Sequence, residues 1–252
     1  MGINTNAVQR LYVAYFNRPA DPRGLQRFED KLTENLGEDV AATKSDLAAI
    51  SSTFSSSAEF TASYDGLSNL QIVNKLYLNI FGREADFDGL TFFANALDDG
   101  SHTVESLALH LSYAAQGTDK VVVDARIEAA VAFTSGINTT EELLGYDGLA
   151  AAAQGKAYLD QISGTLPTDE ATITGQKTSA IENVDASIEA AVLAGNTVAG
   201  SVYTLTAGVD SGLAFTGTAG DDTYNADLTA GGANTLNTLD RLDGGDGTDI
   251  IN

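Results

Sequence analysis

Residues 11–28 read Leu11-Tyr-Val-Ala-Tyr-Phe-Asn-Arg-Pro-Ala-Asp-Pro-Arg-Gly-Leu-Gln-Arg-Phe28, and residues 76–93 read Leu76-Tyr-Leu-Asn-Ile-Phe-Gly-Arg-Glu-Ala-Asp-Phe-Asp-Gly-Leu-Thr-Phe-Phe93. Nine of the eighteen aligned positions are identical, and the alignment needs no gap. In each copy, apolar residues at helical spacing lead to a Phe-x-Arg break, and an aspartate then precedes a second apolar stripe. The repeat predicts two helical hairpins that pack on each other.

The polar residues of the repeat stand at the corner between its two helices. An aspartate at this place can accept backbone N–H bonds as an N-cap, and Pro22 suits the first helical position. A calcium pair formed by Asp86 and Asp88 is the alternative, although Arg23 occupies the position of Asp88 in the first copy. We therefore expect four residues to be structural caps and ion pairs: Asp21, Asp86, Arg18 and Arg83.

The composition divides the chain in two. Up to about Leu193 the sequence is rich in Ala, Leu and Glu, which predicts roughly seven to ten helices. After residue 195 it changes to Thr, Gly, Asp and Asn, with strand-like alternation at Val202-Tyr-Thr-Leu205. The predicted fold is mainly α: a multi-helix bundle with an internal hairpin repeat over residues 1–195, then a short β segment over 196–252 that leads into a calcium-binding β-roll.

Charge and composition limit the partners. The chain of 252 residues carries 13 basic and 35 acidic residues, for a net charge of −22, and it has no cysteine. Such a charge repels nucleic acid and anionic membranes and favours divalent cations. No stretch of about 18 apolar residues occurs, so direct membrane insertion is not expected. Disulfides and thiol nucleophiles are excluded.

A calcium-binding signature stands at the end of the chain. Gly244-Gly-Asp-Gly-Thr-Asp-Ile-Ile-Asn252 fits the nonapeptide G-G-x-G-x-D-x-U-x at every fixed position. Gly217-Thr-Ala-Gly-Asp-Asp-Thr-Tyr224 is a degenerate version, whose aspartates could equally serve a simple turn. Calcium prefers such hard oxygen ligands. The expected calcium-site residues are Asp221, Asp222, Asp243, Asp246, Asp249, Gly245 and Gly247.

The helical repeat resembles a family of unassigned function that is common in large exported bacterial proteins, including S-layer proteins and calcium-binding adhesins. The chain has a helical part first, then Thr/Gly/Asp-rich strands, then the nonapeptide. This order is similar to that of the N-terminal part of Gram-negative S-layer proteins exported by type I secretion. This resemblance implies a secreted cell-surface protein. Its N-terminal domain would bind the O-polysaccharide (O-antigen) of lipopolysaccharide or another surface polysaccharide. Its calcium-bound C-terminal part, beyond residue 252, would self-associate into a lattice and carry the export signal.

Catalysis is not expected. The chain has two histidines and lacks the H-E-x-x-H, G-x-S-x-G and P-loop motifs, and nothing singles out a carboxylate pair for glycoside hydrolysis. Polysaccharide binding would use exposed aromatic rings beside polar side chains. The candidates are Tyr64, Tyr113, Tyr146 and Tyr158, with helix-end packing as the alternative role for each. The alternative function is the N-terminal module of a type I secreted adhesin or extracellular hydrolase.

Overall fold

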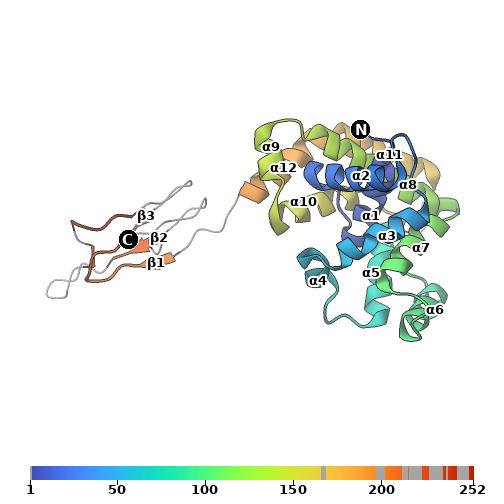
Figure 1. Ribbon diagram of the computed structural model, residues 1–252, viewed down its shortest axis with the longest axis horizontal. Coiled ribbons are helices and arrows are strands. Elements are labelled where there is room, and N and C mark those ends of the chain that lie inside the picture. Colours follow the sequence, from blue (N-terminus) through green and yellow to red (C-terminus); the bar gives the residue numbers. More distant parts are fainter. Residues whose placement is uncertain are drawn as a thin grey trace. The chain divides into compact units, whose positions relative to one another are not determined.

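The computed structural model describes residues 2–165, 169–196, 202–211, 215, 223–226, 235–236, 238–242 and 250–252. The chain divides into two compact units, Met1–Val192 and Leu193–Asn252, which we call the helical unit and the β unit (Figure 1). The division lies close to the composition change at residue 195. The protein is mainly helical, as predicted.

The described residues form twelve helices: α1 (Thr5–Phe16), α2 (Pro22–Leu36), α3 (Lys44–Ser55), α4 (Ala58–Tyr64), α5 (Asn69–Phe81), α6 (Phe87–Asp98), α7 (Val104–Ala114), α8 (Gly117–Gly136), α9 (Thr140–Gly145), α10 (Gly148–Asp160), α11 (Glu170–Glu182) and α12 (Val184–Asn196). The expectation of seven to ten was too low. The short helices α4 and α9 begin at the side-chain caps Ser57 and Thr139, and helices this short have no apolar period to reveal them.

The internal repeat is larger than the sequence analysis indicated. The hairpin α1–α2 corresponds to α5–α6 with an offset of 65 residues, from Leu11 to Leu76. The helices that follow correspond with an offset of 60: Thr43 caps α3 and Thr103 caps α7, each through a capping box. Helices α1–α4 and α5–α8 are therefore two copies of one four-helix unit. The copies differ most in their last helix, because α4 has 7 residues and α8 has 20.

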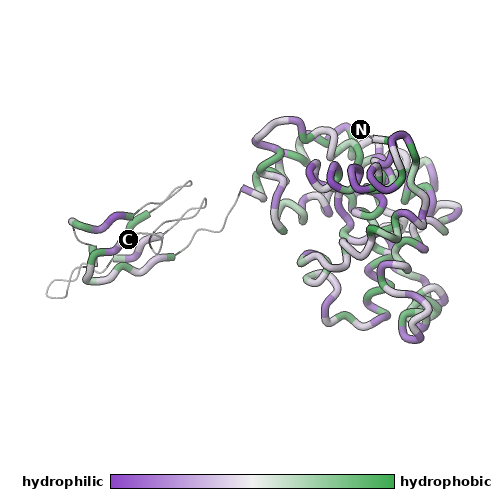
Figure 2. The backbone as a smooth tube through the Cα atoms, in the orientation of Figure 1, coloured by the Kyte–Doolittle hydropathy of each residue, from purple (hydrophilic) through white to green (hydrophobic). Residues whose placement is uncertain are grey.

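The helical unit has two adjoining apolar cores. The first gathers side chains from α1 to α8, with aromatic rings stacked around Phe54. The ring of Phe28 lies 4.5 Å from it and the ring of Tyr12 lies 5.1 Å from it. The second core lies mainly between α8, α10, α11 and α12 around Phe133. Helix α2, largely hydrophilic in Figure 2, contributes the buried residues Leu25, Phe28 and Leu32, with the partly buried Leu36 packed against the first core.

A buried arginine joins both copies of the repeat to the second core. The Arg126 side chain on α8 is 1% exposed. Its Nη1 donates to Asn17 Oδ1 at 2.7 Å and to the Asn79 carbonyl at 2.8 Å, and its Nε donates to the Ile162 carbonyl at 2.8 Å. Burial lowers the pKa of Arg126 to about 10, against the opposing influence of Asp160, so the guanidinium stays charged at neutral pH.

The β unit contains three short strands among its described residues: β1 (Val202–Thr204), β2 (Thr223–Asn225) and β3 (Ile250–Ile251). They form a parallel sheet in the order β1-β2-β3. Tyr203 pairs with Tyr224, and their rings stack with centroids 4.8 Å apart. The described residues thus establish a short parallel sheet, and the calcium-binding β-roll stays a prediction from the sequence.

Replacing Arg126 with methionine should lower the free energy of unfolding by about 3–5 kcal/mol, because the partners of the guanidinium would stay buried without a donor. Chemical denaturation followed by far-ultraviolet circular dichroism measures the change. The control is Lys120→Met near the exposed start of the same helix, which should cost less than about 1 kcal/mol. An Arg126→Met variant as stable as the parent protein would contradict this account.

Candidate functional site

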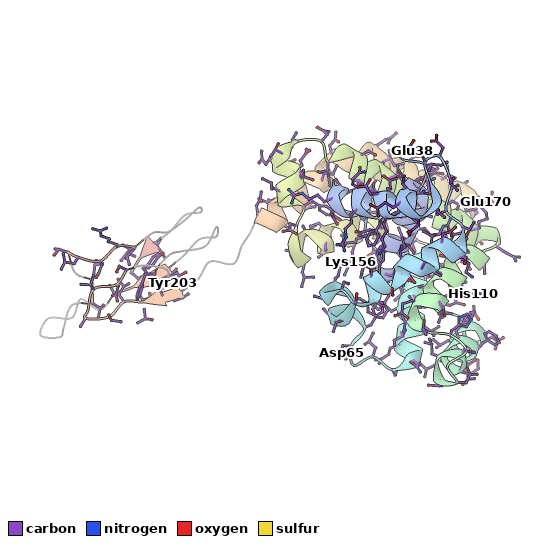
Figure 3. The ribbon with its side chains drawn as sticks, viewed as in Figure 1. Glu38, Asp65, His110, Lys156, Glu170 and Tyr203 are labelled. Atoms are coloured by element: carbon purple, nitrogen blue, oxygen red, sulfur yellow. The ribbon has the colours of Figure 1, made fainter. Side chains whose placement is uncertain are left out.

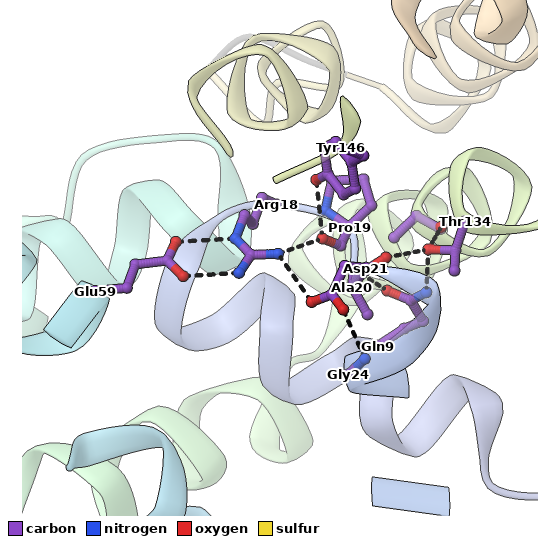
Figure 4. A network of polar contacts seen from close by, with 10 residues as sticks. Gln9, Arg18, Pro19, Ala20, Asp21, Gly24, Glu59, Thr134 and Tyr146 are labelled. Carbon is purple, nitrogen blue, oxygen red and sulfur yellow. Dashed lines mark hydrogen bonds and ion pairs between the residues drawn. The ribbon is translucent and has the colours of Figure 1, made fainter. Parts of the chain in front are cut away.

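The corner between α1 and α2 is fixed by polar contacts (Figure 4). Asp21 is the N-cap of α2, and its side chain accepts from the Gly24 amide at 2.6 Å. Arg18 donates to both carboxylate oxygens of Glu59, through Nε at 2.9 Å and Nη2 at 2.7 Å. Its Nη1 donates to the Pro19 carbonyl at 3.0 Å. The three guanidinium nitrogens of Arg18 and the Gly24 amide thus all donate to oxygens of the chain itself.

The corner between α5 and α6 repeats this arrangement. Asp86 accepts from the Gly89 amide at 2.8 Å, and Arg83 donates to both oxygens of Asp119 at 2.9 and 2.8 Å. The third guanidinium nitrogen donates to the Glu84 carbonyl at 3.0 Å. The predicted caps and ion pairs at Asp21, Asp86, Arg18 and Arg83 are confirmed. These contacts also favour the capping role of Asp86 over a calcium pair with Asp88.

The acidic partners of the two arginines, Glu59 and Asp119, were not among the predicted residues. Glu59 and Asp119 each stand sixteen residues after the threonine that caps the preceding helix, Thr43 or Thr103. This shared spacing in the two copies could have identified the two acids as equivalent residues. Burial alone lowers the pKa of Arg18, but its hydrogen bonds to Glu59 more than offset that effect, so the pKa is raised. The positive charge of Arg18 is therefore balanced by Glu59 and serves the fold.

A polar hollow of about 220 Å³ opens beside the first corner. It is lined by Arg18, Asp21, Pro22, Arg23, Leu143, Leu144, Tyr146, Asp147, Gly148 and Ala152. The hollow brings one tyrosine candidate, Tyr146, together with two residues of the predicted corner. The Tyr146 ring is 5% exposed and its hydroxyl donates to the Pro19 carbonyl at 3.2 Å. Two polar side chains of the hollow, those of Arg23 and Asp147, take no part in the contacts of the corner and can meet a ligand.

The other tyrosine candidates are dispersed. Tyr64 and Tyr158 are 5% and 1% exposed, and their hydroxyls donate to the carbonyls of Tyr15 at 2.9 Å and Ala129 at 3.2 Å. The expectation of exposed rings was wrong for these two and for Tyr146, because each hydroxyl finds a backbone acceptor and the ring can then be buried. Tyr113 is 40% exposed, with the Arg10 guanidinium 4.7 Å above its ring.

The expected calcium-site residues lie outside the described part of the chain: Asp221, Asp222, Asp243, Asp246, Asp249, Gly245 and Gly247. Among the described residues, no group of three or more His, Asp or Glu side chains is placed to hold a metal ion. The calcium site thus stays a prediction from the nonapeptide.

Comparison with known families and proteins gives one match. Residues 51–118 match the model of a family described as a domain of unknown function, DUF4214. This family is common in exported bacterial surface proteins. The matched range runs from the end of α3 to the start of α8 and contains the second copy of the hairpin, so the resemblance of the repeat to a family of unassigned function is confirmed there. No curated protein and no solved structure matches the chain. None of the helices among the described residues is long and apolar enough to cross a membrane.

Replacing Asp86 with asparagine should flatten the acid dependence of stability. The hydrogen bond from the Gly89 amide holds the pKa of Asp86 below its usual value of 3.8, so the unfolded chain binds a proton more readily. The contribution of Asp86 is complete above that value and is lost as the pH falls through the lowered pKa. Denaturation curves between pH 7 and about pH 2 measure the effect.

The matched control is Asp88→Asn, which removes a carboxylate from the same first turn at a residue that is not the N-cap. We expect its stability to decline with acid as steeply as that of the parent protein. Equal flattening in both variants would show that general charge repulsion, and not the cap, governs this region.

Proposed function

We propose that this protein is the N-terminal anchoring part of a calcium-dependent S-layer on a Gram-negative cell. In this proposal the helical unit binds the O-polysaccharide of lipopolysaccharide, and the β unit begins a calcium-bound region through which the protein self-associates into a lattice. The protein is secreted and non-catalytic. The observation that carries the proposal is the direct succession of a helical repeat typical of exported surface proteins and a parallel sheet within a nonapeptide-bearing segment.

The β unit supports the calcium part of the proposal. Its strands are parallel, follow the order of the chain and bring like residues into register, as Tyr203 with Tyr224. Asn252 Nδ2 also donates to Asn225 Oδ1 on the neighbouring strand at 3.3 Å. Successive coils of a solenoid stack in this way, since each coil covers the apolar face of its neighbour. A β-roll with calcium at its glycine turns continues the same stacking.

The hollow at the first corner supports the polysaccharide part. Arg23 and Asp147 offer a donor and an acceptor for sugar hydroxyls, beside the apolar side chains of Leu143 and Leu144. With a net charge of −22, contact with an anionic lipopolysaccharide requires a neutral O-antigen or bridging calcium. Calcium is therefore expected to govern both anchoring and assembly.

The first test measures binding of the 252-residue chain to lipopolysaccharide from its own source, with and without O-antigen. We expect O-antigen-dependent binding in millimolar calcium that weakens in chelator. Arg23→Ala and Asp147→Ala should each reduce it, whereas Arg27→Ala, one turn further along α2, should leave it unchanged. An absence of binding under every condition would overturn the anchoring role and favour the adhesin or hydrolase alternative.

The second test concerns calcium and the β unit. Calcium at about one hundred times its dissociation constant should stabilise the β unit by about 2.7 kcal/mol, and magnesium should not. Thermal unfolding with calcium, magnesium or chelator measures this, and Asp249→Asn should reduce the calcium effect. The control Asp65→Asn, on the loop after α4, should respond to calcium as the parent does. If calcium leaves the β unit's unfolding unchanged, the calcium part of the proposal is wrong.

A further inference from the structure

A second and larger cavity, of about 400 Å³, lies within the helical unit. Its walls come from the ends of α1, α4 and α5, from α8 and from α10. The lining residues are Tyr15, Phe16, Asn17, Ser63, Lys75, Leu78, Asn79, Gly82, Arg126, Lys156 and Asp160. Ser63 belongs to the last turn of α4. The cavity thus opens where α4 ends, whereas the corresponding helix α8 continues to Gly136.

The charge of this cavity is opposite to that of the whole chain. Three of the 13 basic residues line it, namely Lys75, Arg126 and Lys156, and Asp160 is the one acidic residue among its lining residues. Asp160 is already engaged, since it accepts from Asn17 Nδ2 at 2.8 Å and lies 3.6 Å from Arg126 Nη2. In the described part of the chain, no carboxylate lies within ion-pair distance of either lysine. The cavity therefore carries a surplus of positive charge. Its lining residue Lys156 on α10 is labelled in Figure 3.

A comparison of the two copies of the repeat shows that the surplus of positive charge arises at Lys75. Lys75 corresponds to Arg10 in the first copy, and Arg10 lies 3.7 Å from the carboxylate of Asp124. With the offset of 60, Asp124 corresponds to Tyr64, and the Lys75 ammonium lies 5.5 Å from the Tyr64 ring centre. The same contact between the copies is thus made twice: as an ion pair between Arg10 and Asp124, and as a lysine over an aromatic ring between Lys75 and Tyr64. The acid that neutralises Arg10 has no counterpart beside Lys75.

Two backbone carbonyls at the end of α1, beside the cavity, already have side-chain donors. The carbonyl groups of the last turn of α1 accept from Asn79 Nδ2, at 3.2 Å for both Ala14 and Tyr15, and Tyr15 also accepts from the Tyr64 hydroxyl. Burial lowers the pKa of Lys75, and the nearby charge of Lys156 lowers it further. Two like charges in one cavity, neither with a carboxylate partner at ion-pair distance, are destabilising, and a bound anion would relieve this repulsion.

We propose that the cavity binds one carboxylate-bearing sugar unit, of the hexuronic acid class. Its carboxylate lies between Lys75 and Lys156, the Ser63 hydroxyl meets a ring hydroxyl, and the half-exposed side chain of Leu78 packs on the ring's C–H face. A volume of about 400 Å³ suits a sugar residue and exceeds what a single small anion fills. The choice of a sugar rests on the proposed polysaccharide binding, whereas the preference for an anion rests on the cavity's charge alone. The local positive charge of the cavity lets one acidic sugar unit bind there without bridging calcium, although the net charge of the whole chain is negative.

The experiment compares three probes on the full 252-residue chain at fixed calcium: methyl glucuronide, methyl glucoside and inorganic phosphate. Titration followed by amide nuclear magnetic resonance gives each dissociation constant. We expect the glucuronide to bind on the order of tenfold more tightly than either of the other probes, because only it offers both charge and ring. Lys75→Gln and Lys156→Gln should each weaken glucuronide binding on the order of tenfold.

The matched control is Lys31→Gln on the exposed face of α2, which removes the same charge away from the cavity and should leave the affinity unchanged. Equal binding of glucuronide and glucoside would overturn the inference, as would phosphate binding as tightly as the glucuronide, or a Lys156→Gln variant that is folded and binds normally. The outcome is separable from the anchoring test: lipopolysaccharide binding without glucuronide binding sinks this inference alone, and the reverse result sinks the anchoring role alone.

Discussion

The helical unit depends on one charge placed in its interior. A guanidinium taken out of water is costly unless its N–H groups find acceptors, and Arg126 finds them on three separate segments. Two of these segments are the C-terminal ends of α1 and α5, the first helices of the two copies. Helix C-termini present carbonyl oxygens without intrahelical partners and carry partial negative charge, so a cation between them is favourable. Arg126 thereby fixes how the two hairpins meet.

The same interaction explains where the two copies of the repeat must differ. Asn17 and Gly82 end their helices in the left-handed conformation, with φ of 55° and 60°. The Asn17 side chain is one of the acceptors of Arg126. A Cβ at Gly82 would stand 2.7 Å from Arg126 Nη2 and 2.8 Å from the Ile162 carbonyl, so that side of the guanidinium has no room for a side chain. One arginine serves two equivalent corners by bonding to a side chain at one and to backbone at the other.

Sequence patterns predicted the features that depend on residues close together in the chain, such as the helix caps. The Asp-x-x-Gly spacing after Phe-x-Arg was enough to place Asp21 and Asp86 as caps, since capping depends on residues three positions apart. Arg126 gave no comparable signal, because a single arginine in an apolar helix reads equally as a surface residue, and its acceptors lie 36 to 109 residues away. The sequence left Tyr64, Tyr146 and Tyr158 open between exposure and helix-end packing for the same reason: their hydroxyl partners are distant in sequence. The cavity at Lys156 depends on where α4 stops, which only the assembled helices reveal.

The pairing of Arg10 with Asp124 and of Lys75 with Tyr64 is reciprocal: each copy reaches across to the other from the same position. This is the geometry of a self-complementary interface between two identical subunits, in which residue i meets j and j meets i. In a true homodimer every substitution appears on both sides of the symmetry axis. With both halves in one covalent chain, the first copy can end its fourth helix at Tyr64, while the second copy has Asp124 at the corresponding position and continues its helix to Gly136. Fusion thus permits an asymmetric feature at the centre of a symmetric scaffold.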